Sequence, residues 1–205
     1  MKATRHEDLF TWSVYQPDRR IDFNGFYWRR RGGGVLIDPM PLCPTILEWL
    51  AGQPGAVRFI ILTNVDHLRA GPELRDHFGA RLIAPSCDRK LLPGGIDGWY
   101  DENTPLPTEL AIEAHWVHGG KTEAEAVIHL PDLDALLFGD VVRSDASGVL
   151  RRLPDPKVQD EARVCADLRG LAGLSFSSVL LGDGDSLFTG ARAAFDRLLA
   201  TLPPS

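Results

Sequence analysis

The chain is poor in the features that mark secreted, membrane-spanning and nucleic-acid-binding proteins. It has three cysteines among 205 residues and no C-x-x-C pair, which suits a reducing compartment better than a disulfide framework. No segment approaches the roughly 18 apolar residues of a membrane span. The charged start also lacks the apolar stretch of a secretory signal. We therefore expect a cytoplasmic protein that does not insert into a membrane.

Positive charge is also scarce. The 22 lysines and arginines are outnumbered by 28 acids, the net charge is −6, and no long basic stripe is present. This balance argues against nucleic acid as a partner and leaves a small molecule as the expected substrate or ligand. A homodimer is the default expectation for the oligomeric state.

The hydrophobic pattern predicts two successive blocks of strands and helices. With 44% hydrophobic residues the chain can bury one substantial core, so we predict a single domain over residues 1–205. Each block begins with β-rich runs and continues with strands and helices, which indicates a mixed α+β or α/β fold. The expected strands are 9–15, 20–28, 34–37, 57–62, 81–84, 111–117, 125–129, 135–138 and 178–181. The expected helices are 45–51, 68–78, 159–171 and 187–199, and residues 93–107 are expected to form a loop.

Two short polar stretches come directly after apolar runs in which we expect strands. The first is Thr63-Asn64-Val65-Asp66-His67, and the second is Gly139-Asp140 after the strand that ends at Phe138. Open sheets usually present their chemistry just past the carboxyl ends of strands. Two further motifs, Gly120-Lys121-Thr122 and Gly182-Asp183-Gly184, complete the set.

In this chain order the four motifs resemble the metal-binding motifs of the metallo-β-lactamase-fold hydrolases. That family carries His-x-His-x-Asp-His, a later Gly-His-Thr, a Gly-Asp after a strand, and a final His near a glycine. The resemblance covers about residues 33–200. It implies a four-layer αββα sandwich, with two sheets packed face to face and helices outside.

The resemblance also implies that one of the family's two metal positions has lost its ligands. Its three histidines fall on Leu62, Asn64 and Lys121, and the lysine ammonium repels a cation. The second metal position keeps a complete set, in which an aspartate replaces the family's final histidine. The implied ligands are Asp66, His67, Asp140 and Asp183.

Three carboxylates and one imidazole form an oxygen-rich set that suits manganese, iron or magnesium and that zinc also accepts. The implied cofactor is therefore one divalent ion, zinc, manganese or iron, or none. Three anionic ligands would make a bound water a weaker acid than in an all-histidine zinc site. Lys121 could offset that charge, hold Asp140 in place and stabilise a developing oxyanion.

The main hypothesis is a hydrolase that cleaves an ester-, thioester- or phosphoester-like bond with water held on one ion. Its candidate catalytic residues are Lys121, Asp66 and Asn64, although Asn64 also suits a simple turn. The alternative is a metal-free, catalytically inactive descendant that binds a small ligand or acts as a scaffold. In that case Lys121 and a protonated His67 neutralise the acidic cluster as a salt-bridge network.

A minor alternative from another class is a haloacid-dehalogenase-like phosphatase. Gly182-Asp183-Gly184-Asp185 resembles its acidic magnesium motif, and Asp38 after the strand at 34–37 could be its nucleophile. That family needs a second aspartate two residues later, where this chain has Met40. It also requires Asp38 and Asp183 at the same sheet end. The histidines outside the motifs, His6, His77, His115 and His129, are expected to be structural or exposed.

The motif alignment predicts a gain of metal binding from two substitutions. Asn64→His combined with Lys121→His returns two of the three missing imidazoles and removes the competing ammonium, so the variant should bind more metal per chain than the wild type. Elemental analysis of both proteins after incubation with zinc measures the difference. Equal metal content would contradict the alignment.

Overall fold

The computed structural model describes residues 1–92, 94–146 and 148–203, and the chain divides into two compact units. The first unit is Met1–Tyr100 and the second is Asp101–Ser205. Each unit combines its own sheet with two α-helices. Among the described residues, no helix has the length and apolarity needed to cross a bilayer.

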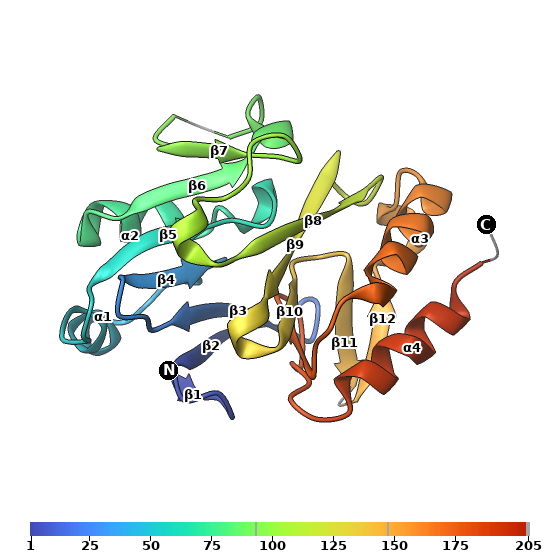
Figure 1. Cartoon of the computed structure of the whole chain (residues 1–205), viewed down its shortest axis with the longest axis horizontal. Helices are drawn as coiled ribbons and strands as arrows, with labels where there is room; N and C mark the ends of the chain where they lie inside the picture. The colour runs from blue at the N-terminus through green and yellow to red at the C-terminus, as the bar shows by residue number, and fades with distance from the viewer. Residues whose placement is uncertain (93, 147, 204–205) are drawn as a thin grey trace. The chain divides into compact units, whose positions relative to one another are not determined.

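The first unit contains a seven-stranded sheet in simple chain order (Figure 1). The pairs from β1 to β4 are antiparallel and those from β4 to β7 are parallel. The strands are β1 (Lys2–Ala3), β2 (Leu9–Gln16), β3 (Ile21–Trp28), β4 (Gly34–Ile37), β5 (Val57–Ile61), β6 (Arg81–Pro85) and β7 (Gly98–Tyr100).

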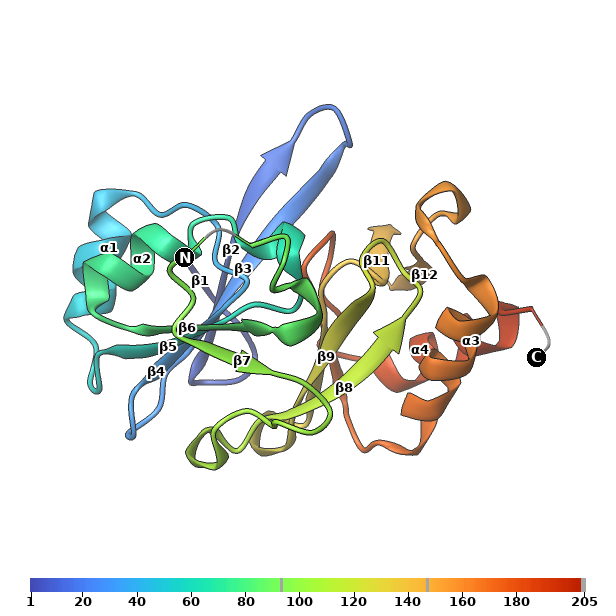
Figure 2. The same ribbon diagram turned by 90° about the horizontal axis from the view of Figure 1, so that it is seen from above.

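Two helices, α1 (Pro44–Ala51) and α2 (Gly71–Phe78), lie on one face of this sheet (Figure 2). Leu50 of α1 and Leu74 of α2 belong to the same buried cluster as Leu36 of β4 and Ile60 of β5. All four residues of β4 are buried, as are four of the five in β5. Near-continuous apolar runs of this kind are typical of parallel strands covered on both faces.

The second unit contains a mixed four-stranded sheet and a separate hairpin. The sheet order is β13-β10-β9-β8, in which β10 and β13 are parallel and the other pairs are antiparallel. The sheet strands are β8 (Glu113–His118), β9 (Ala124–Leu130), β10 (Ala135–Phe138) and β13 (Ser178–Leu181), and the hairpin is β11 (Val142–Ala146) with β12 (Val149–Arg152).

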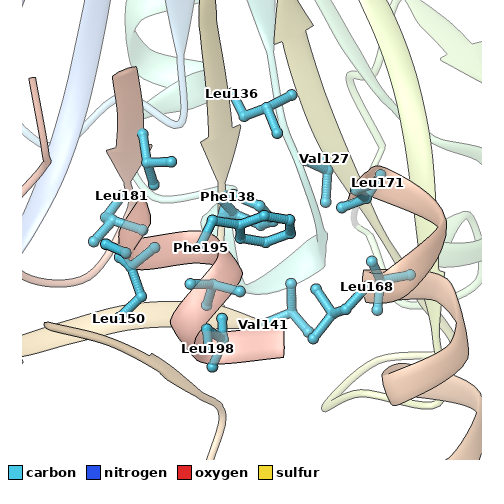
Figure 3. Close-up of a cluster of buried hydrophobic side chains, with 14 of the residues drawn as sticks. Val127, Leu136, Phe138, Val141, Leu150, Leu168, Leu171, Leu181, Phe195 and Leu198 are labelled. Carbon is cyan, nitrogen blue, oxygen red and sulfur yellow. The ribbon is translucent and has the colours of Figure 1, made fainter. Parts of the chain in front are cut away.

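Helices α3 (Glu161–Gly170) and α4 (Ala191–Thr201) cover one face of the second sheet. Figure 3 shows Phe195 of α4 over Phe138 of β10, with their ring centroids 5.9 Å apart. Leu168 of α3 and Val127 of β9 belong to the same cluster. Fully burying one such aliphatic or aromatic side chain contributes about 1.5–3 kcal/mol, so this cluster holds the helices on the sheet.

Short 3₁₀ segments complete the structure. They are η1 (Val65–His67), η2 (Ser86–Asp88), η3 (Thr108–Leu110), η4 (Pro131–Leu133), η5 (Asp155–Lys157) and η6 (Leu171–Gly173). The predicted helix 68–78 is therefore wrong at its start, because η1 and a turn precede α2, which begins at Gly71. The predicted loop 93–107 is also wrong in part, since β7 lies within it; Pro93 itself lies outside the described residues.

The structure excludes the phosphatase alternative. Asp38 follows β4 of the seven-stranded sheet, whereas Asp183 follows β13 of the four-stranded sheet. The two aspartates therefore do not follow strands of one sheet, as that mechanism requires. The prediction of a single domain over residues 1–205 stays a prediction.

A backbone contact in the second unit fixes the turn after β13. Gly184 has a φ of 88° and forms an isolated parallel bridge with Ser144 of β11. A Cβ at Gly184 would overlap the carbonyl oxygen of Ser144. Only glycine combines this backbone angle with so close an approach, so the turn that carries Asp183 depends on Gly184.

This contact predicts a large difference between two glycine substitutions. Gly184→Ala and Gly190→Ala both place a side chain at positive φ, but a Cβ at Gly190 meets no atom within 4 Å. We expect Gly190→Ala to cost about 1 kcal/mol of unfolding free energy and Gly184→Ala about 3 kcal/mol or more. Urea denaturation measures both, and similar costs would contradict the role given to the Ser144 contact.

Candidate functional site

The first group of candidate residues lies at one edge of the sheet in the first unit. Strands β4 and β5 are parallel neighbours, so the residues after Ile37 and Ile61 meet at the same edge. Asp38, fully buried, accepts hydrogen bonds there from the backbone N–H (2.8 Å) and the hydroxyl (2.7 Å) of Thr63. The strand pairing thus joins the first motif to an aspartate 25 residues earlier.

His67 is held against this aspartate. Its Nδ1 lies 2.7 Å from Oδ2 of Asp38, and both side chains are buried. A carboxylate only accepts hydrogen bonds, so this pairing assigns the proton to Nδ1 and leaves the lone pair on Nε2. An imidazole that donates Nδ1–H to a carboxylate is the arrangement of many metal-ligating histidines. The orientation of His67 therefore suits metal ligation through Nε2.

An arginine donates to that same nitrogen. Nη2 of Arg69 lies 3.0 Å from Nε2 of His67. Arg69 is further held by the carbonyl oxygens of Asn24 and Asp38 and lies over the ring of Phe23, 5.1 Å from its centroid. Since one lone pair serves one partner, the guanidinium and a metal ion are mutually exclusive at Nε2.

The other residues of the first motif differ in their surroundings. The side chain of Asn64 accepts the backbone N–H of Asp66 at 2.9 Å and so caps η1, while the Asp66 side chain is exposed. Leu62, at the position of the family's first histidine, is fully buried in the apolar cluster of the first unit. A buried leucine offers no ligand atom, so the described residues do not fit a second ion of the family's kind at this position.

The second group of candidate residues lies at one edge of the sheet in the second unit. Strands β10 and β13 are parallel, and Phe138 is in register with Leu181. Asp140 and Asp183 each come two residues after these positions, so both follow the same sheet edge. Both aspartates are buried, with exposed fractions of 6% and 5%.

A buried glutamate fixes the backbone around Asp140. The carboxylate of Glu125, on β9, accepts the backbone N–H groups of Gly139, Asp140 and Val141 at 2.7–3.2 Å. Three N–H donors stabilise the charged form of a buried carboxylate and satisfy a turn that would otherwise bury unpaired amides. Glu125 therefore fixes the backbone that carries the side chain of Asp140.

Lys121 lies beside Asp140 within the same unit. Its Nζ is 3.4 Å from Oδ2 of Asp140, and its side chain is 29% exposed. This is longer than the 2.7–2.9 Å typical of a strong charge-assisted hydrogen bond. The ammonium thus offsets part of the charge of Asp140 through a long ion pair.

Comparison with known proteins identifies the family. A sequence model described as the metallo-beta-lactamase superfamily matches residues 1–202. The chain belongs to this superfamily. No curated protein matches the chain. The predicted membership of the metallo-beta-lactamase superfamily is therefore confirmed over nearly the whole chain.

Solved metallo-beta-lactamases share the fold. A metallo-beta-lactamase from Pontibacter korlensis is 16% identical with a TM-score of 0.76, over 98% of this chain and 97% of that one. One from Hirschia baltica is 15% identical with a TM-score of 0.76, over 99% and 97%. One from Pseudomonas aeruginosa, solved in its mono-zinc form, is 15% identical with a TM-score of 0.74, over 97% and 92%. The predicted fold class is confirmed.

The sequence analysis named the candidate ligands but not the side chains that orient them. It named the motif residues that the metallo-beta-lactamase resemblance assigns, but it missed the side chains that orient them: Asp38, Arg69 and Glu125. Glu125 carried a signal, because it is the one acid in a mainly apolar strand. Asp38 was weighed only as a phosphatase nucleophile, and its pairing with His67 depends on the β4–β5 neighbourhood that the sequence does not state.

The Asp38 contact predicts a tautomer change at His67. In Asp38→Asn the amide keeps the size of the side chain and tolerates the φ of 49° at this position. It can no longer accept equally from Thr63 and from Nδ1–H of His67. We expect a loss of about 1–3 kcal/mol of unfolding free energy and a shift in the ¹⁵N resonances of the His67 ring.

Asp18→Asn, in an exposed turn of the same unit, is the matched control. It should change the unfolding free energy by less than about 0.5 kcal/mol. Unchanged His67 ring resonances in Asp38→Asn would contradict the assigned proton position.

Proposed function

We propose that this metallo-beta-lactamase-superfamily protein is a hydrolase that uses one divalent ion and cleaves an ester-, thioester- or phosphoester-like bond. The ligand set is the one that the motif comparison assigns: Asp66, His67, Asp140 and Asp183. The observation that carries the proposal is the buried Asp38–His67 hydrogen bond of 2.7 Å. It fixes the ring so that the lone pair of Nε2, which accepts from Arg69, has the orientation that a ligating histidine needs.

A second observation supports the proposal. Glu125 still fixes the turn of Asp140 through three backbone N–H groups. The orienting contacts of two assigned ligands are therefore intact, although the family's other metal position is lost. Such contacts typically change metal affinity 10- to 100-fold when they are removed.

The residues of the chain then have separate roles. A bound zinc, manganese or iron ion would supply Lewis acidity and lower the pKa of water. Asp38 holds the proton of His67 on Nδ1, which keeps the Nε2 lone pair available. Lys121, loosely paired with Asp140, donates to the oxygen on which negative charge develops as water attacks the scissile bond. Arg69 must release Nε2 before an ion can bind there.

A second candidate function has its own observation. Arg69 donates to Nε2 of His67, and Lys121 lies against Asp140, so an assigned ligand in each unit is already beside a cationic side chain. If these pairs persist in solution, the protein is a metal-free ligand-binding or scaffold protein. Its ligand would be a small anion, because guanidinium and ammonium groups bind carboxylates and phosphates.

Asp140→Ala separates these candidates. The variant should no longer bind the one equivalent of metal that the assigned ligands hold. It should also no longer hydrolyse ester, thioester or phosphoester substrates. Asp185→Ala removes an exposed acid two residues past Asp183 and should retain both. The measurements are elemental analysis of protein purified without chelators and hydrolysis assays with zinc, manganese and iron.

Turnover that survives in Asp140→Ala would overturn the mechanism. A wild-type protein whose metal content and turnover equal those of Asp140→Ala, even after each ion is supplied, would favour the metal-free alternative. Similar urea midpoints in the two variants exclude unfolding as the cause.

A further inference from the structure

The second unit contains a second group of metal-ligating side chains, outside the motifs already described. Glu113, His115 and His129 each offer a ligand atom, and these three atoms lie within 4.8 Å of one another. Sequence reasoning treated both histidines as structural or exposed. The structure shows instead that the strand pairing gathers them on one face of the sheet.

The register explains the grouping. Glu113 and His115 are two residues apart on β8, so their side chains share a face, and Glu113 is directly opposite His129 on β9. Oε2 of Glu113 lies 2.8 Å from Nδ1 of His129 and 3.7 Å from Nε2 of His115. Ligand atoms around a tetrahedral zinc ion are roughly 3.3 Å apart, as bond lengths near 2.0 Å require. Adjustments of about 0.5 Å, within the reach of side-chain torsions, would thus bring the two measured pairs to that spacing.

His129 has the surroundings of a ligated histidine. Its Nε2 lies 3.1 Å from the carbonyl oxygen of Ser175, which can only accept a hydrogen bond, so Nε2 carries a proton. Nδ1 lies 2.8 Å from Oε2 of Glu113, to which it donates, and an ion bound at Nδ1 would replace that proton. A histidine whose second ring nitrogen donates to a backbone carbonyl has a fixed ring orientation, which is typical of metal ligands.

His115 provides an independent observation. Its Nε2 is shielded from solvent and has no hydrogen-bond partner among the described residues. A shielded ring nitrogen without a hydrogen bond is costly, and a metal ion would satisfy it. Burial lowers the pKa of His115, His129 lowers it further, and Glu113 acts in the opposite direction. The hydrogen bond with His129 keeps the pKa of Glu113 below its ordinary value.

The surroundings favour a cation. Glu113 and His115 line a cavity of about 600 Å³ whose other described lining residues include Asp101 and Glu102 but neither lysine nor arginine. Carboxylates that line a cavity raise the local concentration of cations. Glu113 itself is 57% exposed, so an ion can reach it from solvent.

We propose that Glu113, His115 and His129 form a binding site for a divalent transition-metal ion, with zinc as the best match to two imidazoles and one carboxylate. Three protein ligands leave the fourth position of a tetrahedral ion to water or to a ligand in the adjoining cavity. The ion would link β8, an outer strand of the four-stranded sheet, to β9. The site does not depend on the hydrolase proposal, because it shares no residue with that ligand set.

Zinc titration in an Asp140→Ala background tests the site alone. Competition with a chromophoric chelator should show one equivalent of zinc bound by Asp140→Ala. The affinity should fall at least tenfold when His115→Gln or Glu113→Gln is added, since each removes one of three ligands. Zinc should also raise the thermal midpoint of Asp140→Ala and not that of Asp140→Ala with His115→Gln, because an ion bound only to the folded state stabilises it.

His118→Gln in the same background is the matched control. His118 lies on the same strand and is also half-buried, but its Nδ1 pairs with Asp167, 2.9 Å away. Zinc affinity should be unchanged in this variant. Absence of zinc binding in Asp140→Ala, unchanged affinity with His115→Gln, or an equal loss with His118→Gln would each overturn the proposal.

Discussion

The buried hydrogen bond between Asp38 and His67 is the interaction on which the account of this site depends. It exists because β4 and β5 are parallel neighbours whose carboxyl ends meet at one edge of the sheet. It places the proton on Nδ1 and leaves a single lone pair on Nε2. That lone pair serves either Arg69 or a metal ion. A contact 2.7 Å long thus prepares one nitrogen for either of these two partners.

In the second unit, too, a pair of parallel strands places candidate ligands at one edge of a sheet. The parallel pair β10 and β13 places Asp140 and Asp183 at one sheet edge, and Glu125 holds the turn that carries Asp140. Around His67 and around Asp140, the chain has an orienting carboxylate, Asp38 or Glu125, and a cationic neighbour, Arg69 or Lys121. In the motif alignment Leu62, Asn64 and Lys121 stand where the superfamily's other metal position has its three histidines. In each unit an acid or imidazole named by the motifs therefore lies beside a cationic side chain.

The sequence predicted the superfamily, the fold class and most elements, because long apolar runs and ordered motifs carry that information. The hydrophobic pattern predicts strand β9 and helix α3, whereas the helix predicted at 187–199 is wrong at its start, because α4 begins at Ala191. Three kinds of feature did not follow. Strand β7 lies in a segment rich in proline and glycine, and the exposed positions of the hairpin of β11 and β12 include apolar Ala146 and Val149, so neither has a clear periodic signal. The Asp38–His67 and Glu113–His129 pairs depend on strand register, which local patterns do not specify.

The central claim is that Nε2 of His67 is a metal ligand in the working protein. Its most direct test is an anomalous difference map from crystals grown with manganese or zinc. If Nε2 is a ligand, the map has a peak at coordination distance from it, and the Arg69 guanidinium is displaced from its 3.0 Å contact. A map with no peak there, and with Arg69 still donating to Nε2, would contradict it and make the metal-free function the better description.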